Sequence, residues 1–446
     1  MSAPQSPASR TGSPTRVIVA GLIGTSLEWY DFFLYGSAAA LVFNRLFFPT
    51  FEELTGTLLA FATYAVGFVA RPLGGVVFGH FGDLVGRKNV LVITLLLMGI
   101  STCLIGVLPT YATIGVAAPI LLVALRFLQG VGLGGEWGGA VLMSIEHGGA
   151  DRRGLNASWP QVGVPAGNLL AAGVLGLLSA IMPQESFLAW GWRVPFLLSG
   201  VLVLVGLWIR VTIAESPLFT EVERANRKAK VPIMEVIRQH PRSLLSAMAA
   251  RIGTDVVFYT FSLYILTYVS QTLGLSDTVA LNAVLIGSAF QLALIPLFGL
   301  LSDRYGRRPV YLAGAIGAGV WVFAFFPLLD TRSTGMIIIA AVVALLFHAM
   351  MYGPQAAFIA ELFSTRLRYS GASMGYQVAG ILGGALAPII ALSLLGTFGT
   401  TLAISLYVVV ALLITVAGLA IAPETRDIDL HEELPGAARA ARPTSA

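Results

Sequence analysis

The chain has 446 residues, of which 56% are hydrophobic and 11% are charged, and its formal net charge is +4. Water-soluble domains carry about 25% charged residues, so this composition excludes a soluble protein and indicates an integral membrane protein. The single cysteine, Cys103, excludes an intrachain disulfide.

Hydrophobic runs of about 20 or more residues recur along the whole chain, and this is the length that a helix needs to cross a hydrocarbon core of about 30 Å. Strands of a membrane barrel would be about ten residues long and would alternate in polarity. We therefore predict an all-α integral membrane fold. Its twelve transmembrane helices are expected at residues 17–43, 54–78, 89–109, 114–145, 155–182, 193–214, 243–271, 278–301, 309–329, 336–360, 372–395 and 399–422.

The longest polar stretch, residues 215–242, separates the sixth predicted helix from the seventh. It divides the chain into an N-terminal six-helix bundle at 17–214 and a C-terminal six-helix bundle at 243–422. Residues 1–16 and the tail at 423–446 are polar and are predicted to be disordered. Residues 1–16 lead into a long span and lack the short apolar region of a signal peptide, so the first helix is expected to remain in the protein.

The positive charges predict the orientation of the chain. If both termini are cytoplasmic, only Arg45, Arg193 and Arg332 of the 27 Lys and Arg residues fall on outer loops. Cytoplasmic loops of membrane proteins carry such an excess of positive charge. We expect a multi-pass protein of the inner (plasma) membrane with both termini in the cytoplasm. Because topology explains the basic pI of about 9.2, no nucleic-acid partner is expected.

Two segments of the first half recur in the second half. GHFGDLVGRKN at 79–89 returns as GLLSDRYGRRP at 299–309, and EHGGADRRGLNASWPQ at 146–161 returns as ELFSTRLRYSGASMGYQ at 361–377. Parallel repeats of this kind are typical of transporters in which two halves rock around a site near the membrane midplane. The repeats are predicted to form a conformational switch on the cytoplasmic side, made of Gly79, Asp83, Gly86, Arg87, Lys88, Glu146, Arg152, Asp303, Gly306, Arg307, Arg308, Glu361 and Arg366.

The first predicted helix carries two acids, Glu28 and Asp31, near its middle. A charge at the bilayer centre costs about 2.5 to 3.5 kcal/mol on insertion scales. Steps of three and four residues place both acids and Tyr35 on one stripe, which can face a cavity. A carboxyl in a partly dry cavity holds a proton more readily than in water. Glu28 and Asp31 are therefore predicted to carry a coupling proton, with Asp31 preferred because it lies deeper. The alternative is a structural ion pair with Arg71 or Arg126.

The fourth predicted helix carries Arg126, whose forked and permanently charged guanidinium suits a substrate carboxylate. Gln129 lies one turn away and can donate to the same group, and the alternative partner for Arg126 is an acid of the first helix. Glu136 lies about 15 Å further along the axis, too far to pair with Arg126, and is the third candidate proton carrier. Glycines at 130, 134 and 138 are predicted to allow close helix packing.

The seventh predicted helix carries Arg251 and Asp255, whose spacing of four predicts an ion pair. In the tenth, His348 shares one face with two further polar side chains, and we interpret it as hydrogen-bonded structure with a proton relay as the alternative. The remaining substrate-binding candidates on these and other helices are Tyr35, Trp137, Asp255, Tyr259, Tyr352 and Gln355.

The sequence contains no nucleotide-binding loop, metal-ligand cluster or nucleophile–base pair. We therefore expect no enzymatic activity, no cofactor and no metal. Without a nucleotide site, the proton gradient is the favoured energy source.

The loop GHFGDLVGRK with its repeat, the LRFLQG of the fourth helix and the twelve-helix layout resemble the major facilitator superfamily. Within it, EWYDFFLYG, LVFNRLFFP, VARPLGGVVFGHFGD, LQGVGLGGEWGGA and AWGWRVPF resemble the metabolite:proton symporter family, which includes shikimate, 2-oxoglutarate, citrate and proline/betaine carriers. The resemblance covers residues 17–424. It implies proton-coupled uptake of a small carboxylate-bearing metabolite by alternating access, in a chain that can function as a monomer.

Three alternatives stay open at this point. A proline or glycine betaine carrier could hold a quaternary ammonium among Trp29, Tyr30, Trp137 and Tyr259. A drug:proton antiporter is the second, because GVPAG at 163–167 is similar to an antiporter signature. A non-transporting sensor that kept the fold is the third.

Overall fold

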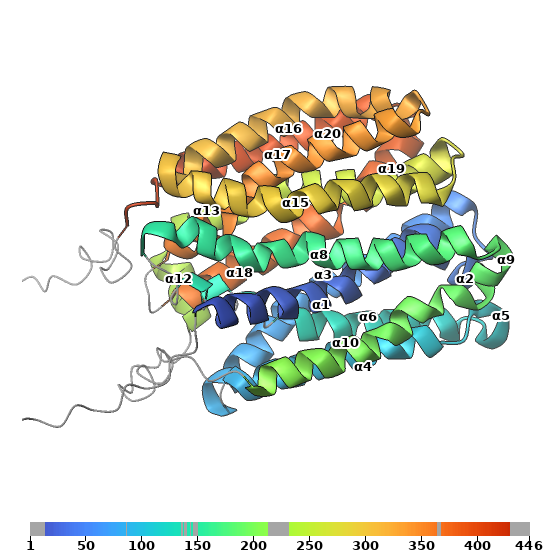
Figure 1. The fold of residues 1–446 in the computed structure, drawn as a ribbon, viewed down its shortest axis with the longest axis horizontal. Coiled ribbons are helices and arrows are strands. Elements are labelled where there is room, and N and C mark those ends of the chain that lie inside the picture. The colour runs from blue at the N-terminus through green and yellow to red at the C-terminus, as the bar shows by residue number, and fades with distance from the viewer. Residues whose placement is uncertain are drawn as a thin grey trace, which may run out of the picture.

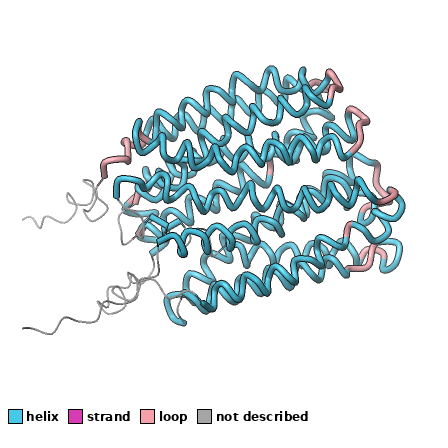
Figure 2. The backbone as a smooth tube through the Cα atoms, viewed as in Figure 1, coloured by secondary structure: helices cyan, strands magenta, loops and turns pink. Residues whose placement is uncertain are grey.

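The computed structural model describes residues 14–85, 87–134, 137, 141–142, 144–145, 150–212, 232–363 and 367–428. Every regular element in these ranges is helical (Figure 2). The long helices run side by side along a common direction (Figure 1), and α1 begins at the end of the bundle where the described chain also ends. We call this end the terminal face and the other end the opposite face.

The helices of the first half alternate in direction between the two faces. They are α1 Pro14–Ala38, η1 Ala39–Phe43, α2 Asn44–Phe47, α3 Glu53–Val85, α4 Arg87–Val107, α5 Tyr111–Ile114, α6 Ala117–Gly134, η2 Ala150–Arg152, α8 Arg153–Ile181, α9 Gln184–Ser186, η3 Phe187–Gly191 and α10 Arg193–Thr212.

The second half follows the same plan after a short helix that precedes its first long one. Its helices are α12 Pro232–Gln239, α13 Pro241–Tyr259, η4 Thr260–Tyr264, α14 Ile265–Thr267, η5 Tyr268–Thr272, α15 Asp277–Tyr305, α16 Arg307–Asp330, α17 Thr334–Glu361, α18 Arg368–Gly380, η6 Ile381–Ala385, α19 Ala387–Phe398 and α20 Thr401–Ile421.

The predicted membrane spans agree closely with these helices. Within the described part of the chain, nine helices are long and apolar enough to cross a membrane, and the bent pair Gln184–Gly191 with Arg193–Trp208 is a tenth candidate. The two other predicted spans correspond to the continuous helical run 14–47 and to α4, whose apolar part is Val92–Val107. The division into two six-helix bundles with a central loop remains a prediction.

The two halves meet along neighbouring long helices. α1 packs along α8, and α8 packs along α15 of the second half (Figure 1). Inside the first half, α6 lies directly on α3, because a Cβ atom on Gly130 or Gly134 would collide with a carbonyl oxygen of Gly67 or Arg71. The prediction that these glycines allow close packing is confirmed, and Gly138 lies outside the described residues.

Charged and apolar side chains are sorted between the interior and the surface of the bundle. Ile181, Trp208 and Val320 expose 67%, 70% and 70% of their surface, as suits side chains that face hydrocarbon. Glu28 and Asp31, in contrast, are each 4% exposed. The two acids of the first helix therefore avoid the high cost of contact with lipid.

Candidate functional site

The acidic stripe of α1 divides between two environments. The Asp31 carboxylate faces α10, where it accepts a hydrogen bond of 2.5 Å from the Ser199 hydroxyl. Glu28 lines a cavity between the two halves. Tyr35 donates from its hydroxyl to Thr63 of α3 at 2.8 Å. In this conformation only Glu28 of these three side chains lines that cavity, and Asp31 is turned from Glu28 by about 60° around the helix axis.

Arg126 is a buried cation held by aromatic rings. It is 1% exposed, and its guanidinium carbon lies 4.4, 4.3 and 4.7 Å from the ring centroids of Phe32, Tyr35 and Tyr64. Its Nη1 donates to Gln129 Oε1 at 3.0 Å, while Nε and Nη2 have no hydrogen-bond partner among the described residues. Buried donors are almost always satisfied, so these two N–H groups are an exception.

No acid of α1 forms an ion pair with Arg126 or Arg71 in the part of the chain that the structure describes. Neither of the predicted pairings is therefore present in this conformation. Asp31 is connected to Arg126 indirectly. Gln129, which accepts from Arg126, donates to Thr102 Oγ1 at 2.7 Å, and Thr102, whose hydroxyl donates to Met98 O at 2.9 Å, lies near Asp31. Thr102 thus lies between the carboxyl of Asp31 and the cation of Arg126.

Arg71 is the second cation of this region. Its guanidinium carbon lies 4.2 Å from the centroid of Phe32 and 4.3 Å from that of Phe68. Its Nε and Nη2 also lack hydrogen-bond partners among the described residues. Arg71 lines the same cavity as Glu28, and the other polar and aromatic side chains of that cavity are Thr25, Trp29, Trp137, Tyr376 and Gln377.

The second half contributes a layered contact to the wall of this cavity. Trp137 stacks on Tyr376 with ring centroids 3.6 Å apart. The guanidinium carbon of Arg251 lies 3.1 Å from the centroid of the same tyrosine ring. Arg251 Nε lies 2.8 Å from Asp255 Oδ2, so the ion pair that the spacing predicts is present. Asp255 is thereby occupied in this conformation and leaves no free carboxylate for substrate.

The other substrate-binding candidates are spread around the centre. Tyr259 packs against Tyr64 and Phe68 of the first half, at 6.3 and 5.5 Å between centroids. Tyr352 meets Tyr376 through their hydroxyls at 3.3 Å. Gln355 donates to Tyr311 at 2.6 Å within the second half, so it is not directed at Arg126.

His348 and Glu136 complete the list of titratable candidates. His348 Nδ1 lies 2.7 Å from Gln291 Nε2, and its ring packs on Phe258, which is the hydrogen-bonded environment expected of it. Glu136 lies outside the described residues and remains a prediction. No group of three or more His, Cys, Asp or Glu side chains in the described ranges could hold a metal ion.

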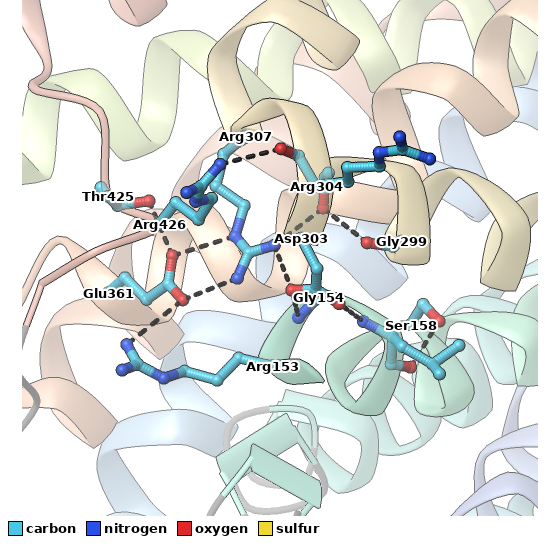
Figure 3. Close-up of polar contacts among 12 residues, drawn as sticks. Arg153, Gly154, Ser158, Gly299, Asp303, Arg304, Arg307, Glu361, Thr425 and Arg426 are labelled. Atoms are coloured by element: carbon cyan, nitrogen blue, oxygen red, sulfur yellow. Dashed lines mark hydrogen bonds and ion pairs between the residues drawn. The ribbon is translucent and has the colours of Figure 1, made fainter. Parts of the chain in front are cut away.

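A charged cluster joins the halves at the terminal face (Figure 3). Asp303 of α15 accepts from the backbone N–H groups of Gly154 and Leu155 at 2.7 and 2.9 Å. These N–H groups belong to the first turn of α8, where the helix dipole favours a carboxylate. The same aspartate also pairs with Arg307 at 2.6 Å. Asp303 is therefore a direct link between the second half and the first.

Arg307 extends the cluster within the second half. It donates to both oxygens of Glu361, at 3.2 and 3.1 Å, and Glu361 also lies 3.7 Å from Arg153 of the first half. Glu424 caps the first N–H groups of α16, at Arg307 and Arg308. Gly306, with φ +99°, makes the tight turn before α16, a conformation that a side chain would strain.

The first-half repeat is described less completely. Arg152 is exposed, and Gly86 and Glu146 lie outside the described residues, as does Arg366 of the second-half repeat. The helix backbone is described at the other predicted switch positions of this repeat, but their side chains are not. Those positions are Gly79, Asp83, Arg87 and Lys88.

Comparison with known proteins identifies the family. The model of the "Sugar (and other) transporter" family matches residues 17–241 and 220–434. A shikimate transporter of Escherichia coli (strain K12) is 43% identical over 404 residues, covering 90% of this chain and 92% of the relative. The chain belongs to this transporter family.

Further relatives and solved structures agree with this membership. An inner membrane metabolite transport protein of Escherichia coli (strain K12) is 42% identical, with 93% and 95% of the two chains covered. A proline/betaine transporter of Salmonella typhimurium (strain LT2) is 36% identical, with 84% and 76% covered. The crystal structure of a D-xylose-proton symporter shares the fold, with a TM-score of 0.73, 20% identity and 94% and 99% coverage.

The protein is thus a multi-pass membrane transporter of the major facilitator fold and not an enzyme. Several residues of its centre were missed by sequence reasoning, notably Thr102, Ser199, Tyr64 and Gln377. A faint signal was present for Tyr64, which lies seven residues, two helical turns, before Arg71. Thr102 and Ser199 are common membrane-helix residues whose partners only the folded bundle reveals.

Proposed function

We propose that this transporter carries a small carboxylate-bearing metabolite, of the shikimate-like or oxo-acid type, together with a proton into the cell across the inner membrane. The observation that supports this most strongly is Arg126, a fully buried cation with two unsatisfied N–H donors between aromatic rings. A forked guanidinium binds a carboxylate through two parallel hydrogen bonds. In a dry site such bonds are stronger than in water.

The proton is assigned to Asp31. Its carboxyl accepts a hydrogen bond from the neutral Ser199 hydroxyl and has no ion pair within the described ranges. A carboxyl without a fixed cation can be protonated and deprotonated as its surroundings change. Binding of the substrate carboxylate would change the hydrogen bonds of Arg126. The link through Gln129 and Thr102 would transmit this change to Asp31.

Co-transport of a proton also favours the movement of an anion energetically. An uncompensated negative charge that moves inward against a potential of 100 mV costs about 2.3 kcal/mol. One proton carried with a monocarboxylate cancels this cost. With a second proton the uptake would be driven by the potential.

In the conformation described here, the two halves are in contact on both sides of the centre. At the terminal face, Asp303 binds the start of α8. Toward the opposite face, Gln271 of η5 donates to Thr57 of α3 at 3.2 Å. Alternating access requires that these contacts break in turn, so that the centre opens first to one side and then to the other.

An osmolyte carrier for proline or glycine betaine is the second candidate, because transporters of that name are 36% and 35% identical to this chain. The aromatic box that would support it does not form in the structure. Tyr30 turns toward α10 and donates to Pro195 O at 2.7 Å, and Trp137 is covered by Tyr376 at 3.6 Å. The geometry of the centre therefore favours a substrate that carries a carboxylate but no ammonium group.

Addition of candidate substrates to energy-depleted cells tests the proposal. Cells that express the protein receive shikimate, 2-oxoglutarate, citrate, proline or glycine betaine while the external pH is recorded. Symport predicts alkalinisation of the medium with at least one of the first three compounds. Acidification would indicate antiport, as in a drug:proton exchanger, and no change with any compound would contradict the proposal and favour a sensor.

The variant Asp31→Asn tests the proton carrier in the same assay. It mimics the protonated carboxyl, so alkalinisation and concentrative uptake are expected to be lost, while exchange of labelled for unlabelled substrate persists. Asp427→Asn is the matched control, because Asp427 lies at the surface and its side chain is 80% exposed. Undiminished concentrative uptake in Asp31→Asn would remove Asp31 from this role and leave Glu28 and Glu136.

A further inference from the structure

The cavity between the halves has its own cation, separate from Arg126. Phe32 lies between the two, with the guanidinium carbon of Arg71 at 4.2 Å from the ring centroid and that of Arg126 at 4.4 Å. Arg126 also contacts Tyr35 and Tyr64, whereas Arg71 contacts Phe68. Because α3 runs toward the terminal face, Arg71 lies about two helical turns closer to that face than Tyr64 does.

Arg71 shows the features of a binding group at this place. It is 1% exposed, and two of its N–H donors have no partner among the described residues. Arg71 lines the cavity itself, which has a volume of about 20 Å³ in this conformation and therefore admits a substrate only after the two halves move apart. A structural arginine at this depth would be expected to have its hydrogen bonds satisfied by the protein.

The rest of the cavity offers groups that complement a hydroxylated or keto carboxylate. Gln377 has an amide oxygen without a partner in the described ranges, while its nitrogen donates to Gly134 O at 3.1 Å and fixes its orientation. Thr25 adds a hydroxyl, and Trp29 and Trp137 supply apolar walls. The cavity therefore combines a fixed cation, a fixed acceptor and flat rings with the carboxyl of Glu28.

We infer that Arg71, with Gln377, forms a second carboxylate-binding site on the terminal side of Phe32, which the transported anion occupies between Arg126 and the terminal face. This inference rests on the proposed function, because the anion is the same substrate. The carboxylate leaves the Arg126 guanidinium as the Phe32 ring moves aside, and it pairs with Arg71. Because the carboxylate passes from one cation to the other, it is paired at each stage. An unpaired carboxylate in the dry interior is thereby avoided.

Binding by the purified full chain in detergent tests the site, with shikimate, 2-oxoglutarate, citrate, proline and glycine betaine titrated in a calorimeter. Arg126→Gln is expected to weaken binding of the ligand by about 30-fold or more but not to abolish it. Addition of Arg71→Gln to that variant is expected to remove the remaining binding. Arg45→Gln, at an exposed position, is the matched control and retains wild-type affinity.

The outcomes separate this inference from the proposed function. A wild-type chain that binds none of the five carboxylates would overturn both. If the wild-type chain binds a carboxylate but Arg126→Gln and the double variant bind it equally, or not at all, the second site alone is overturned. Arg71→Lys keeps the charge without the fork and is expected to bind with intermediate affinity, which distinguishes an anion contact from a folding defect.

Sided kinetics in proteoliposomes provide a second measurement. Because Arg71 lies on the terminal side, Arg71→Gln is expected to raise the KM for substrate presented at the terminal face by about tenfold or more, with a smaller change for substrate presented at the opposite face. Arg126→Gln raises the KM from both sides. An equal change from both sides in Arg71→Gln would contradict the assignment of Arg71 to the terminal side.

Discussion

At the scale of single residues, the centre combines permanent cations with a protonatable acid that does not touch them. Asp31 bonds to Ser199, and Arg126 bonds to Gln129. A direct ion pair would have fixed both charges and would have hindered release of the proton. In the proposed mechanism, a neutral link instead lets one site respond to the other. Thr102 is the residue of this link that belongs to neither site.

Thr102→Val tests this link. The methyl group that replaces the hydroxyl cannot accept from Gln129 Nε2, now 2.7 Å from Thr102 Oγ1, and leaves a buried amide donor unsatisfied at a cost of about 1 to 3 kcal/mol. We expect the KM for uptake to rise about 5- to 100-fold and the pH dependence of uptake to change. Kinetics of uptake between pH 5 and 8 provide the readout.

Thr102→Ser is the control for that substitution, since it keeps the hydroxyl and loses only a methyl group. We expect it to restore both the KM and the pH profile. A valine variant with wild-type kinetics at every pH would show that Gln129 holds Arg126 without Thr102. A serine variant as impaired as the valine variant would point to a packing defect.

At the scale of helices, length and hydropathy predict the elements well because the bilayer imposes both. The predicted spans 155–182, 278–301 and 309–329 agree with the bounds of α8, α15 and α16 to within about one turn. Rotation of a helix about its axis is much harder to predict. The stripe on α1 was correct as a pattern, yet Asp31 faces α10 because both sides of that stripe are covered by protein, and hydropathy cannot distinguish one buried side from another.

The repeated loops also show which contacts a sequence can predict and which it cannot. The repetition predicts that Asp303 and Arg307 matter at the cytoplasmic side, and the structure brings these two side chains together. It does not predict that Asp303 binds the backbone of α8 across the interface. Nearly every residue has a backbone N–H group, so the sequence does not indicate which of these groups a carboxylate binds.

Asp303→Asn is predicted to loosen the terminal face. The neutral amide loses two charge-assisted bonds to α8 and the pair with Arg307, each worth about 1.5 to 3 kcal/mol, so the population open at that face rises. A cysteine at Thr25, in the Cys103→Ser background, is expected to react faster with a membrane-permeant thiol reagent.

Glu424→Gln is the matched control, because Glu424 caps α16 within the second half and does not bridge the halves in the described structure. It is expected to leave the labelling rate at position 25 close to that of the parent. Equal labelling in Asp303→Asn and the parent would show that the carboxylate of Asp303 does not hold the terminal face closed.

At the scale of the whole molecule, the two halves are in contact toward both ends, and the proposed transport requires these contacts to break in turn. The terminal face is held by charge, through Asp303 and its partners. Toward the opposite face the hydrogen bond from Gln271 to Thr57, which joins the halves, is between neutral groups. Because neutral hydrogen bonds are weaker than charge-assisted ones, the opposite face is expected to open more readily when no substrate is bound.

A cross-link at the opposite face tests whether this opening is required. Cysteines replace Thr57 and Gln271 in the Cys103→Ser background, at side chains whose oxygen and nitrogen atoms lie 3.2 Å apart. A flexible bifunctional thiol reagent is expected to join them and to abolish uptake, and reduction should restore it. Each single-cysteine variant should transport after the same treatment. Substrate that dissociates freely to the terminal side of the cross-linked protein would fit alternation, since that face can still open. Full uptake by the cross-linked protein would mean that substrate reaches Arg126 by another route, and the two-sided mechanism would then have to be abandoned.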